Sequence, residues 1–276
     1  MKKVSLCQPN FQQGPIELNA HYLPYSAGIL WSYAQQDDVV KDNYELDQLI
    51  WERRDIEEYV EQLKDNKVVG FSTYVWNRNY IYALARRLKE VNPDVFLFFG
   101  GPEIPHEKKN VFETYPFMDL VVVREGEITF RNLLVALHQG TDLEEINGVV
   151  LNKNGVRVAT PDAPRIKDLE DVPSPYLTGV FDKLMKETLG KVEWNATIET
   201  NRGCPYQCTF CDWGSLTYGK VKKFEYSRVL DEIEWIGKNK CGYITIADAN
   251  FGMFRDRDNE IADKILEVQS KYKFPQ

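Results

Sequence analysis

The hydrophobic pattern of the first half of the chain alternates between short continuous apolar runs and stretches with helical spacing. The apolar runs lie at residues 4–8, 68–74, 94–101 and 119–123. Continuous runs of Val, Ile, Leu and Phe are typical of strands that are buried on both faces. The pattern therefore predicts a parallel sheet that helices cover on both sides.

Helical spacing of the apolar residues falls between these runs. It predicts helices at 24–36, 55–65, 78–91, 111–115 and 127–139. Asn92-Pro93 stops the third of these helices, and Gly140 closes the last one. Strands and helices in alternation, joined by right-handed crossovers, predict an α/β fold with a doubly wound Rossmann-like or flavodoxin-like sheet, which we place at residues 1–145.

The pattern changes after residue 145. Residues 146–160 predict a β-hairpin that turns at Asn154-Gly155, and four prolines between 161 and 175 indicate a linker, so we assign 146–190 to hairpin and linker. The βα pattern returns in a second domain at 191–276. Its predicted elements are strands at 194–200 and 242–248, a helix at 227–238 with Ser227 as N-cap, and a helix at 257–272. Two βα units cannot close a barrel, so we expect a truncated chain or a partner that completes it.

Composition and charge narrow the class of protein. The chain has 276 residues, 43% of them hydrophobic, which is enough for two moderate cores. Its net charge of −8 disfavours general nucleic-acid binding, and the basic stretch at 219–228 is typical of a solvated loop and helix start. The sequence predicts no membrane span and no secretory signal, hence a cytoplasmic protein whose cysteines are reduced.

Three of the five cysteines, Cys204, Cys208 and Cys211, lie in the stretch GCPYQCTFCDW at 203–213. Buried small hydrophobic residues would not cluster in a loop beside glycine and proline. The expected compartment disfavours a disulfide, and a structural zinc site usually needs four ligands, for which Cys241 is the remaining candidate without a partner nearby. An iron–sulfur cluster with three thiolate ligands and one open iron explains the spacing.

C-x3-C-x2-C after the first strand of a βα array, with Phe210 before the third cysteine, resembles the radical S-adenosylmethionine (SAM) superfamily. The resemblance implies a partial TIM-type barrel and a [4Fe-4S] cluster whose open iron chelates SAM. It implies cleavage of SAM to a 5′-deoxyadenosyl radical with an external electron donor of the flavodoxin or ferredoxin type. It also makes Asp248 and Asn250, at the end of the second strand, candidates to bind the amino group of SAM, although both could equally be turn residues.

The first domain resembles the cobalamin (B12)-binding class of this superfamily. The matching stretches are GFSTY at 70–74, FFGGPE at 98–103 and VVREGE at 122–127, and residues 168–176 resemble the linker of this class. The resemblance implies that cobalamin contacts come from these stretches. The implied cofactor-binding residues are Ser72, Thr73, Tyr74, Gly100, Gly101, Pro102, Glu103, Glu125, Gly126 and Glu127.

Some of these residues also suit a structural role. Glycines after a strand allow close backbone approach, but a glycine pair can also form a tight turn, and carboxylates at a helix start complement its dipole. The chain departs from many cobalamin proteins because it has no D-x-H-x-x-G motif. Its histidines are His21, His106 and His138, so the lower face of the cobalt would have no histidine ligand.

The sequence therefore favours a radical SAM enzyme that performs cobalamin-dependent methyl transfer, or related radical chemistry, on a small-molecule substrate. One alternative is a methylthiotransferase-like enzyme, but that family has a second set of three cysteines in its first domain, where this chain has only Cys7. Another alternative is a non-catalytic protein that binds a cluster or a corrinoid.

Overall fold

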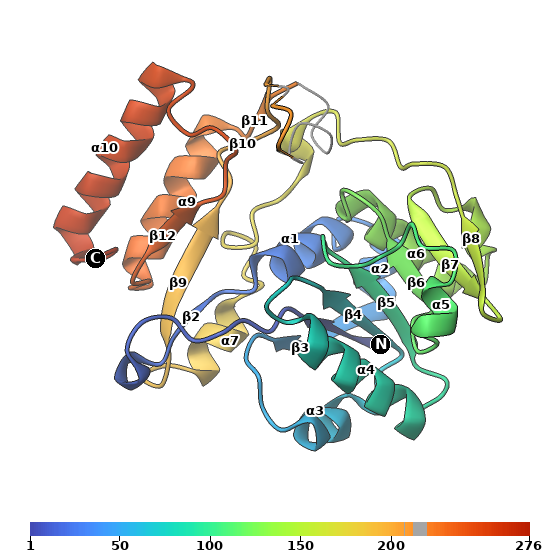
Figure 1. Cartoon of the computed structure of the whole chain (residues 1–276). Helices are drawn as coiled ribbons and strands as arrows, with labels where there is room; N and C mark the ends of the chain where they lie inside the picture. Colours follow the sequence, from blue (N-terminus) through green and yellow to red (C-terminus); the bar gives the residue numbers. More distant parts are fainter. Residues whose placement is uncertain (207, 212–219) are drawn as a thin grey trace. The chain divides into compact units, whose positions relative to one another are not determined.

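The computed structural model describes residues 1–206, 208–211 and 220–276 (Figure 1). The chain forms two compact units. The first consists of Met1–Phe11 and Ser26–Ile166, and the second consists of Gln12–Tyr25 and Lys167–Gln276. The segment after the first strand therefore enters the second unit before the chain returns to complete the first.

The first unit contains a seven-stranded sheet in the order β3-β1-β4-β5-β6-β7-β8. Its strands are β1 (Lys2–Cys7), β3 (Tyr44–Ile50), β4 (Val68–Ser72), β5 (Phe96–Gly100), β6 (Leu120–Val122), β7 (Val149–Lys153) and β8 (Val156–Ala159). The first five are parallel to one another, whereas β7 and β8 add an antiparallel edge. Numbered along the chain, the parallel strands have the order 2-1-3-4-5 of flavodoxin-like folds, which confirms the predicted doubly wound sheet.

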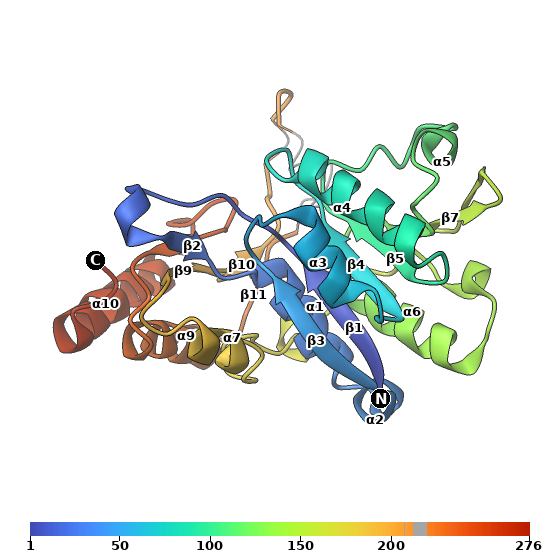
Figure 2. The same cartoon turned by 90° about the horizontal axis from the view of Figure 1, so that it is seen from below.

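Helices cover both faces of this sheet (Figures 1 and 2). On one face lie α3 (Ile56–Leu63), α4 (Arg78–Val91) and the short α5 (Val111–Thr114), and on the other lie α1 (Tyr25–Ala34), α2 (Asp38–Asn43) and α6 (Glu127–Gln139). Val69 and Phe71 of β4 point into the first core. On the opposite face, Phe98 of β5 stacks on Phe130 of α6 with ring centroids 5.2 Å apart. The alternation of sides along each strand thus builds two apolar layers.

The second unit contains a three-stranded parallel sheet in the order β12-β9-β2. Its strands are β2 (Ala20–Tyr22), β9 (Glu193–Ile198) and β12 (Ile244–Ile246), and a separate antiparallel pair joins β10 (Asn201–Arg202) to β11 (Lys222–Lys223). The helices are α7 (Asp182–Glu187), α9 (Tyr226–Lys238) and α10 (Arg255–Tyr272). Short 3-10 turns at Ile16–Leu18, Leu143–Glu145 and Leu169–Asp171 complete the elements that the structure describes.

Several elements differ from the sequence-based expectation. The predicted hairpin forms, with left-handed φ angles of 53° at Asn154 and 87° at Gly155, but β7 pairs with β6. The first unit therefore continues to Ile166, beyond the boundary expected at residue 145. The N-cap of α9 is Glu225, whose side chain accepts a hydrogen bond from the Arg228 N–H, so the prediction of Ser227 was wrong.

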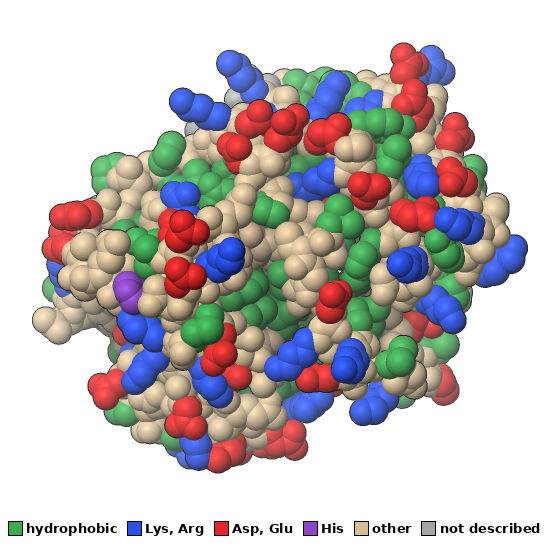
Figure 3. Space-filling model, turned by 180° about the vertical axis from the view of Figure 1, so that it is seen from behind, with side chains coloured by type: hydrophobic (Ala, Val, Ile, Leu, Met, Phe, Trp, Pro, Cys, Tyr) green, Lys and Arg blue, Asp and Glu red, His purple; other side chains and the backbone are tan. Residues whose placement is uncertain are grey.

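The surface has no strong segregation of charge in the view of Figure 3, where acidic and basic side chains are interspersed. Within the part of the chain that the structure describes, we find no helix with both the length and the hydropathy needed to cross a bilayer.

A substitution at Gly70 tests the packing of the sheet. A Cβ at this position would lie 2.1 Å from Cζ of Phe98 and 2.8 Å from Cδ2 of Leu6, in the layer beneath α6. We therefore expect Gly70→Ala to lower the free energy of unfolding by about 1–3 kcal/mol, because the packed core must shift to admit the methyl group. Urea unfolding followed by circular dichroism measures this change.

Gly100→Ala is the matched control. The atoms nearest to a Cβ at Gly100 lie 3.9 Å away, so the added methyl group meets only ordinary contacts. Equal destabilisation by the two substitutions would show that packing against Phe98 is not the cause.

Candidate functional site

The first candidate site lies at the carboxyl ends of the parallel strands of the first unit. The chain leaves β1 toward β3 on one side and later returns to β4 on the other, so β1 and β4 flank a topological switch point. Ligands of open α/β sheets bind outside the strand ends at such a point. Ser72 ends β4, Gly100 ends β5 and Glu125 follows β6, so the three predicted stretches meet at this edge.

The loops after β4 and β5 touch through their backbones. The Thr73 N–H donates to the Gly100 carbonyl at 2.8 Å, and the Glu103 N–H donates to the Thr73 carbonyl at 3.4 Å. Gly101 has a φ of +101°, and a Cβ there would lie 2.3 Å from the Thr73 oxygen. Only glycine fits this approach, which explains the second glycine of the GGPE stretch. Pro102, the next residue, is exposed.

Thr73 has a polar atom that its surroundings do not satisfy. Its side chain is fully buried, and Oγ1 has no hydrogen-bond partner among the described residues. A buried hydroxyl without a partner costs free energy that a bound polar group would recover. Thr73 is thus the predicted residue with the clearest capacity to receive a ligand.

Three aromatic rings extend this edge, and two of them, Trp76 and Phe11, were not predicted from the sequence. Tyr74 stacks on Trp76 with centroids 4.6 Å apart, and Phe11 meets Trp76 edge-on at 6.2 Å. Trp76 remains 41% exposed and Phe11 48% exposed, so they present apolar surface to solvent next to the switch point. An aromatic residue in a loop directly after a buried strand was the signal available in the sequence.

Asn77, also missed from the sequence, anchors two of the loops. Its Nδ2 donates to the Pro9 carbonyl at 3.1 Å and to the Ser72 carbonyl at 3.0 Å, and its Oδ1 accepts from the Tyr74 N–H at 2.8 Å. Because Asn77 is fully buried, these bonds fix the backbone after β1 and β4 where water cannot replace them.

The acidic residues of this edge have protein partners. Glu125 accepts from Arg165 at 3.1 Å and from the Ile166 N–H at 3.2 Å. Glu103 pairs with Arg78 at 2.8 Å. Gly126 is the N-cap of α6 and Glu127 lies buried in its first turn. These contacts suit structural roles, and contact of these residues with cobalamin stays a prediction.

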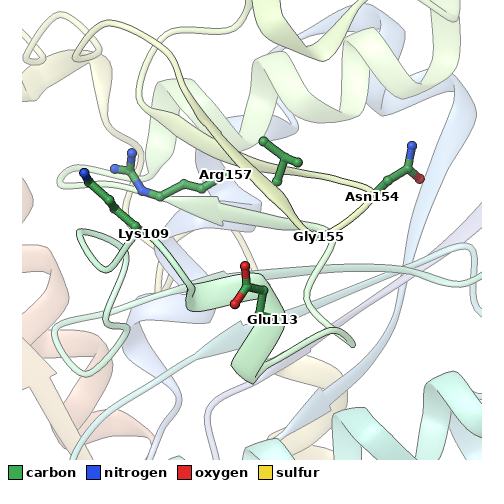
Figure 4. Close-up of a pocket in the computed structure, with 6 residues that line it drawn as sticks. Lys109, Glu113, Asn154, Gly155 and Arg157 are labelled. Carbon is green, nitrogen blue, oxygen red and sulfur yellow. The ribbon is translucent and has the colours of Figure 1, made fainter.

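A surface cavity of about 520 Å³ lies elsewhere in the first unit (Figure 4). It is bounded by Lys109 and Glu113 near α5 and by residues 154–157 of the hairpin between β7 and β8. None of the predicted site residues lines it. We therefore assign it no part in the candidate site.

The second candidate site is the cysteine loop of the second unit. The pairing of β10 with β11 joins the residues just before Gly203 to those just after Val221. Gly203 has a φ of +116°, and a Cβ there would lie 2.2 Å from the Lys220 carbonyl oxygen. The glycine before the first cysteine is therefore needed for the close contact that shuts the base of the loop.

The cysteines of this loop differ in exposure. Cys204 is buried, Cys208 is exposed and Cys211 is half-buried, and the Cys211 N–H donates to the Cys208 carbonyl at 3.1 Å. Within residues 1–206, 208–211 and 220–276, no three Cys, His, Asp or Glu side chains converge as they would around a metal. The structure thus places the three thiols on one loop without bringing them to one point. Soft thiolates are the usual ligands of iron–sulfur clusters, and three of them would leave one iron of a four-iron cluster without a protein ligand.

Phe210, Asn250 and Asp248 lie around this loop in different settings. The Phe210 ring is 92% exposed. The Asn250 amide donates to Sγ of Cys204 at 3.1 Å, which brings the predicted residue to the first cysteine. Asp248 instead accepts hydrogen bonds from Thr200 and Asn201 at the end of β9. Burial raises the pKa of the Asp248 carboxyl, and these hydrogen bonds oppose the rise.

Known proteins are similar to this chain over a length that includes both sites. Residues 26–134 match the family model of the B12 binding domain. The chain is 37% identical, over 92% of its length, to the cobalamin-dependent radical SAM methyltransferase TokK of Streptomyces tokunonensis. It is a homologue of cobalamin-dependent radical SAM methyltransferases. It is also 35% identical, over 92% of its length, to the 2-(S-pantetheinyl)-carbapenam-3-carboxylate methyltransferase of Streptantibioticus cattleyicolor.

Solved structures agree on the fold of this homologue. The cobalamin-dependent SAM radical enzyme OxsB, solved with aqua-cobalamin and SAM bound, superposes with a TM-score of 0.69 at 22% identity, over 98% of this chain and 37% of that one. TsrM of Kitasatospora setae, solved with cobalamin and a [4Fe-4S] cluster bound, also gives a TM-score of 0.69, at 17% identity. The chain spans 37% and 38% of the length of the two methyltransferases named above.

A substitution at Asn77 tests how the loops at this edge of the first unit are held. We expect Asn77→Ala to lower the free energy of unfolding by about 2–3 kcal/mol, because it leaves buried backbone groups of two loops without partners. Asn79→Ala, which changes an exposed residue of the same helix, should stay within about 0.5 kcal/mol of the wild type. Urea unfolding measures both variants, and a stability of Asn77→Ala equal to that of Asn79→Ala would remove Asn77 as an anchor.

Proposed function

We propose that the chain binds cobalamin through its first unit and a [4Fe-4S] cluster with SAM through its second, and that it acts as a cobalamin-dependent radical SAM methyltransferase on a small-molecule substrate. The observation that carries the proposal is the C-x3-C-x2-C loop at the end of β9, in a chain whose first unit has the flavodoxin-like strand order. The alignment of two methyltransferases over 92% of the chain supports this combination.

The edge of the first unit fits a large, flat, mainly apolar ligand with polar side arms. Gly101 lets the backbones after β4 and β5 approach closely, and the buried Thr73 hydroxyl is without a partner among the described residues. Trp76 and Phe11 add exposed aromatic surface, and the half-buried Tyr74 stacks on Trp76, which favours contact with an extended ring system. Cobalamin, when bound, supplies a methyl-carrying cobalt. The residues of this edge would orient it and exclude water.

The cysteine loop fits an iron–sulfur cluster by the chemistry of its donors. Cys204, Cys208 and Cys211 would hold three irons, and the fourth would stay open for SAM. The cluster and SAM together supply a radical initiator when an external one-electron donor of the flavodoxin or ferredoxin type reduces them. Asn250 would orient the Cys204 sulfur, since its amide already donates there at 3.1 Å. Phe210, exposed beside the thiols, would shield the site from water.

The methylthiotransferase alternative has less support. It requires a second set of cysteines in the first unit, where Cys7 stands alone in the sequence. Cys7 is fully buried in β1, and burial raises the pKa of its thiol far above the usual value. Such a thiol is a poor metal ligand because the thiolate is the binding form.

Iron content tests the assignment of the cysteines. We expect the wild-type chain to take up about four irons after anaerobic reconstitution with iron and sulfide, and Cys208→Ala to lose most of this iron, because a thiolate ligand is missing. Cys241→Ala, which alters a buried cysteine outside the loop, should keep wild-type iron. Full iron content in Cys208→Ala would refute the assignment.

SAM cleavage tests catalysis against a purely binding function. Under dithionite, we expect the reconstituted chain to release 5′-deoxyadenosine in an amount that depends on its cluster, as measured by chromatography and mass spectrometry. The Cys208→Ala variant is the negative control, which should release no 5′-deoxyadenosine above background. A chain with a full cluster that releases no 5′-deoxyadenosine would favour the non-catalytic alternative.

A further inference from the structure

The start of the cysteine loop is held by the carboxylate of Asp248. Oδ1 of Asp248 accepts from the Thr200 N–H at 2.7 Å and from the Asn201 N–H at 3.1 Å. Oδ2 accepts from the Thr200 hydroxyl and from Nδ2 of Asn201, the latter at 2.7 Å. Both oxygens of Asp248 are therefore turned toward two of the residues that connect β9 to the loop, Thr200 and Asn201.

Arg257 holds the same point from the opposite direction. Its Nη1 donates to Oγ1 of Thr200, and its Nη2 donates to the Thr200 carbonyl, both at 3.1 Å. Nη2 also donates to the carbonyl of Phe224, which follows β11, at 3.1 Å. The guanidinium group of one residue thus bridges the residue before the loop and the residue after it.

The two ends also bond to each other. The Phe224 N–H donates to the Thr200 carbonyl at 3.0 Å, next to the β10–β11 pairing of Asn201 with Lys223. Thr200 is fully buried, and Asn201 and Phe224 are 3% and 2% exposed. Hydrogen bonds to charged groups are strong in such surroundings because water does not compete for them.

The elements that present these side chains are themselves fixed. Asp258, 2% exposed, accepts from the N–H groups of Gly252 and Phe254, which fixes the turn from β12 into α10. Asp248 precedes this turn and Arg257 follows it. Asn250, in the same turn, donates to Sγ of Cys204. One segment, residues 248–257, therefore contacts the start of the loop, its end and its first cysteine.

We propose that Asp248 and Arg257 are positioning residues that close both ends of the cysteine loop and so preset it to receive a cluster. The proposal deepens the proposed function and rests on it for the identity of the cluster. It assigns Asp248 to the loop instead of to direct contact with SAM. The two residues act through Thr200, which both of them contact.

Hydrogen–deuterium exchange of the full chain without cluster tests directly whether Asp248 and Arg257 hold the two ends of the loop. We expect Arg257→Met to raise the exchange rates of the amides at 200–204 and 222–224 by at least about tenfold, because charged hydrogen bonds that restrain local opening are lost. Arg257→Lys should give an intermediate rate, since an ammonium group can keep part of the contacts. Arg255→Met, which changes an exposed residue two positions earlier, should match the wild type.

Thr200→Val gives an independent measurement, because it removes the hydroxyl that bonds to both Asp248 and Arg257 while it keeps the side-chain shape. It should raise exchange in the same two segments. Unchanged exchange in Arg257→Met and Thr200→Val would overturn the proposal.

Asp248→Asn separates positioning from SAM binding. We expect it to raise loop exchange and to lower iron uptake on reconstitution, because one carboxylate oxygen becomes an amide that faces other donors. Wild-type exchange and iron content with weakened SAM affinity, measured by equilibrium dialysis of labelled SAM, would show a direct SAM contact and overturn the proposal. If the wild-type chain takes up no cluster, the proposed function fails. Exchange in the cluster-free chain still tests whether Asp248 and Arg257 position the loop.

Discussion

Parallel strand pairing is the constraint on which both units depend. Neighbouring parallel strands end at the same edge, so the loops that follow them are brought together there without strand partners of their own. In this chain polar side chains, one buried and one half-buried, replace those partners. Asn77 bonds to the backbone after β1 and β4, and Asp248 bonds to the backbone after β9. The same geometry that gathers candidate ligands thus creates a need for internal hydrogen bonds. Asn77 supplies them from the start of the helix after β4, and Asp248 supplies them from just after the end of the neighbouring strand β12.

The two edges use glycine in the same way. Gly101 and Gly203 both have a positive φ. A Cβ on Gly101 would lie 2.3 Å from a carbonyl oxygen of the loop after β4, and one on Gly203 would lie 2.2 Å from a carbonyl oxygen at the other end of the cysteine loop. Backbone-to-backbone contact of this kind holds a loop at little cost in side-chain entropy. It leaves Thr73 in the first unit and the three cysteines in the second in loops whose bases are fixed. A site that must accept a large cofactor benefits from such restraint before binding.

Local patterns in the sequence predicted most of the first unit, and their failures have physical causes. Buried strands such as Val68–Ser72 carry their signal in their own residues. β2 has only three residues, and it is a strand because it pairs with β9, which lies far along the chain. β3 is an edge strand with polar residues in its middle, so its apolar signal is weak. The hairpin was recognised, but its pairing with β6 depends on tertiary contacts that no local pattern contains.

For the sites, spacing and glycine placement revealed the cysteines and the loop after β5, because each is a property of a few consecutive residues. The positioning role proposed for Asp248 and Arg257 could not be predicted from the sequence. Arg257 bonds to residues 57 and 33 positions away, and such partners become apparent only when the strands are assembled. Trp76 and Phe11 each follow a buried strand in the sequence, but the contact between their rings joins two different loops and becomes apparent only in the structure. Sequence identifies reactive groups here, and the structure identifies what holds them.

The metal content of a single preparation tests the central claim most directly. The full chain, reconstituted anaerobically with iron, sulfide and hydroxocobalamin and freed of unbound cofactor by gel filtration, can be analysed for iron and cobalt together by mass spectrometry. The account predicts about four irons and about one cobalt per chain. Iron without cobalt, or cobalt without iron, would contradict the claim that this chain binds both cofactors.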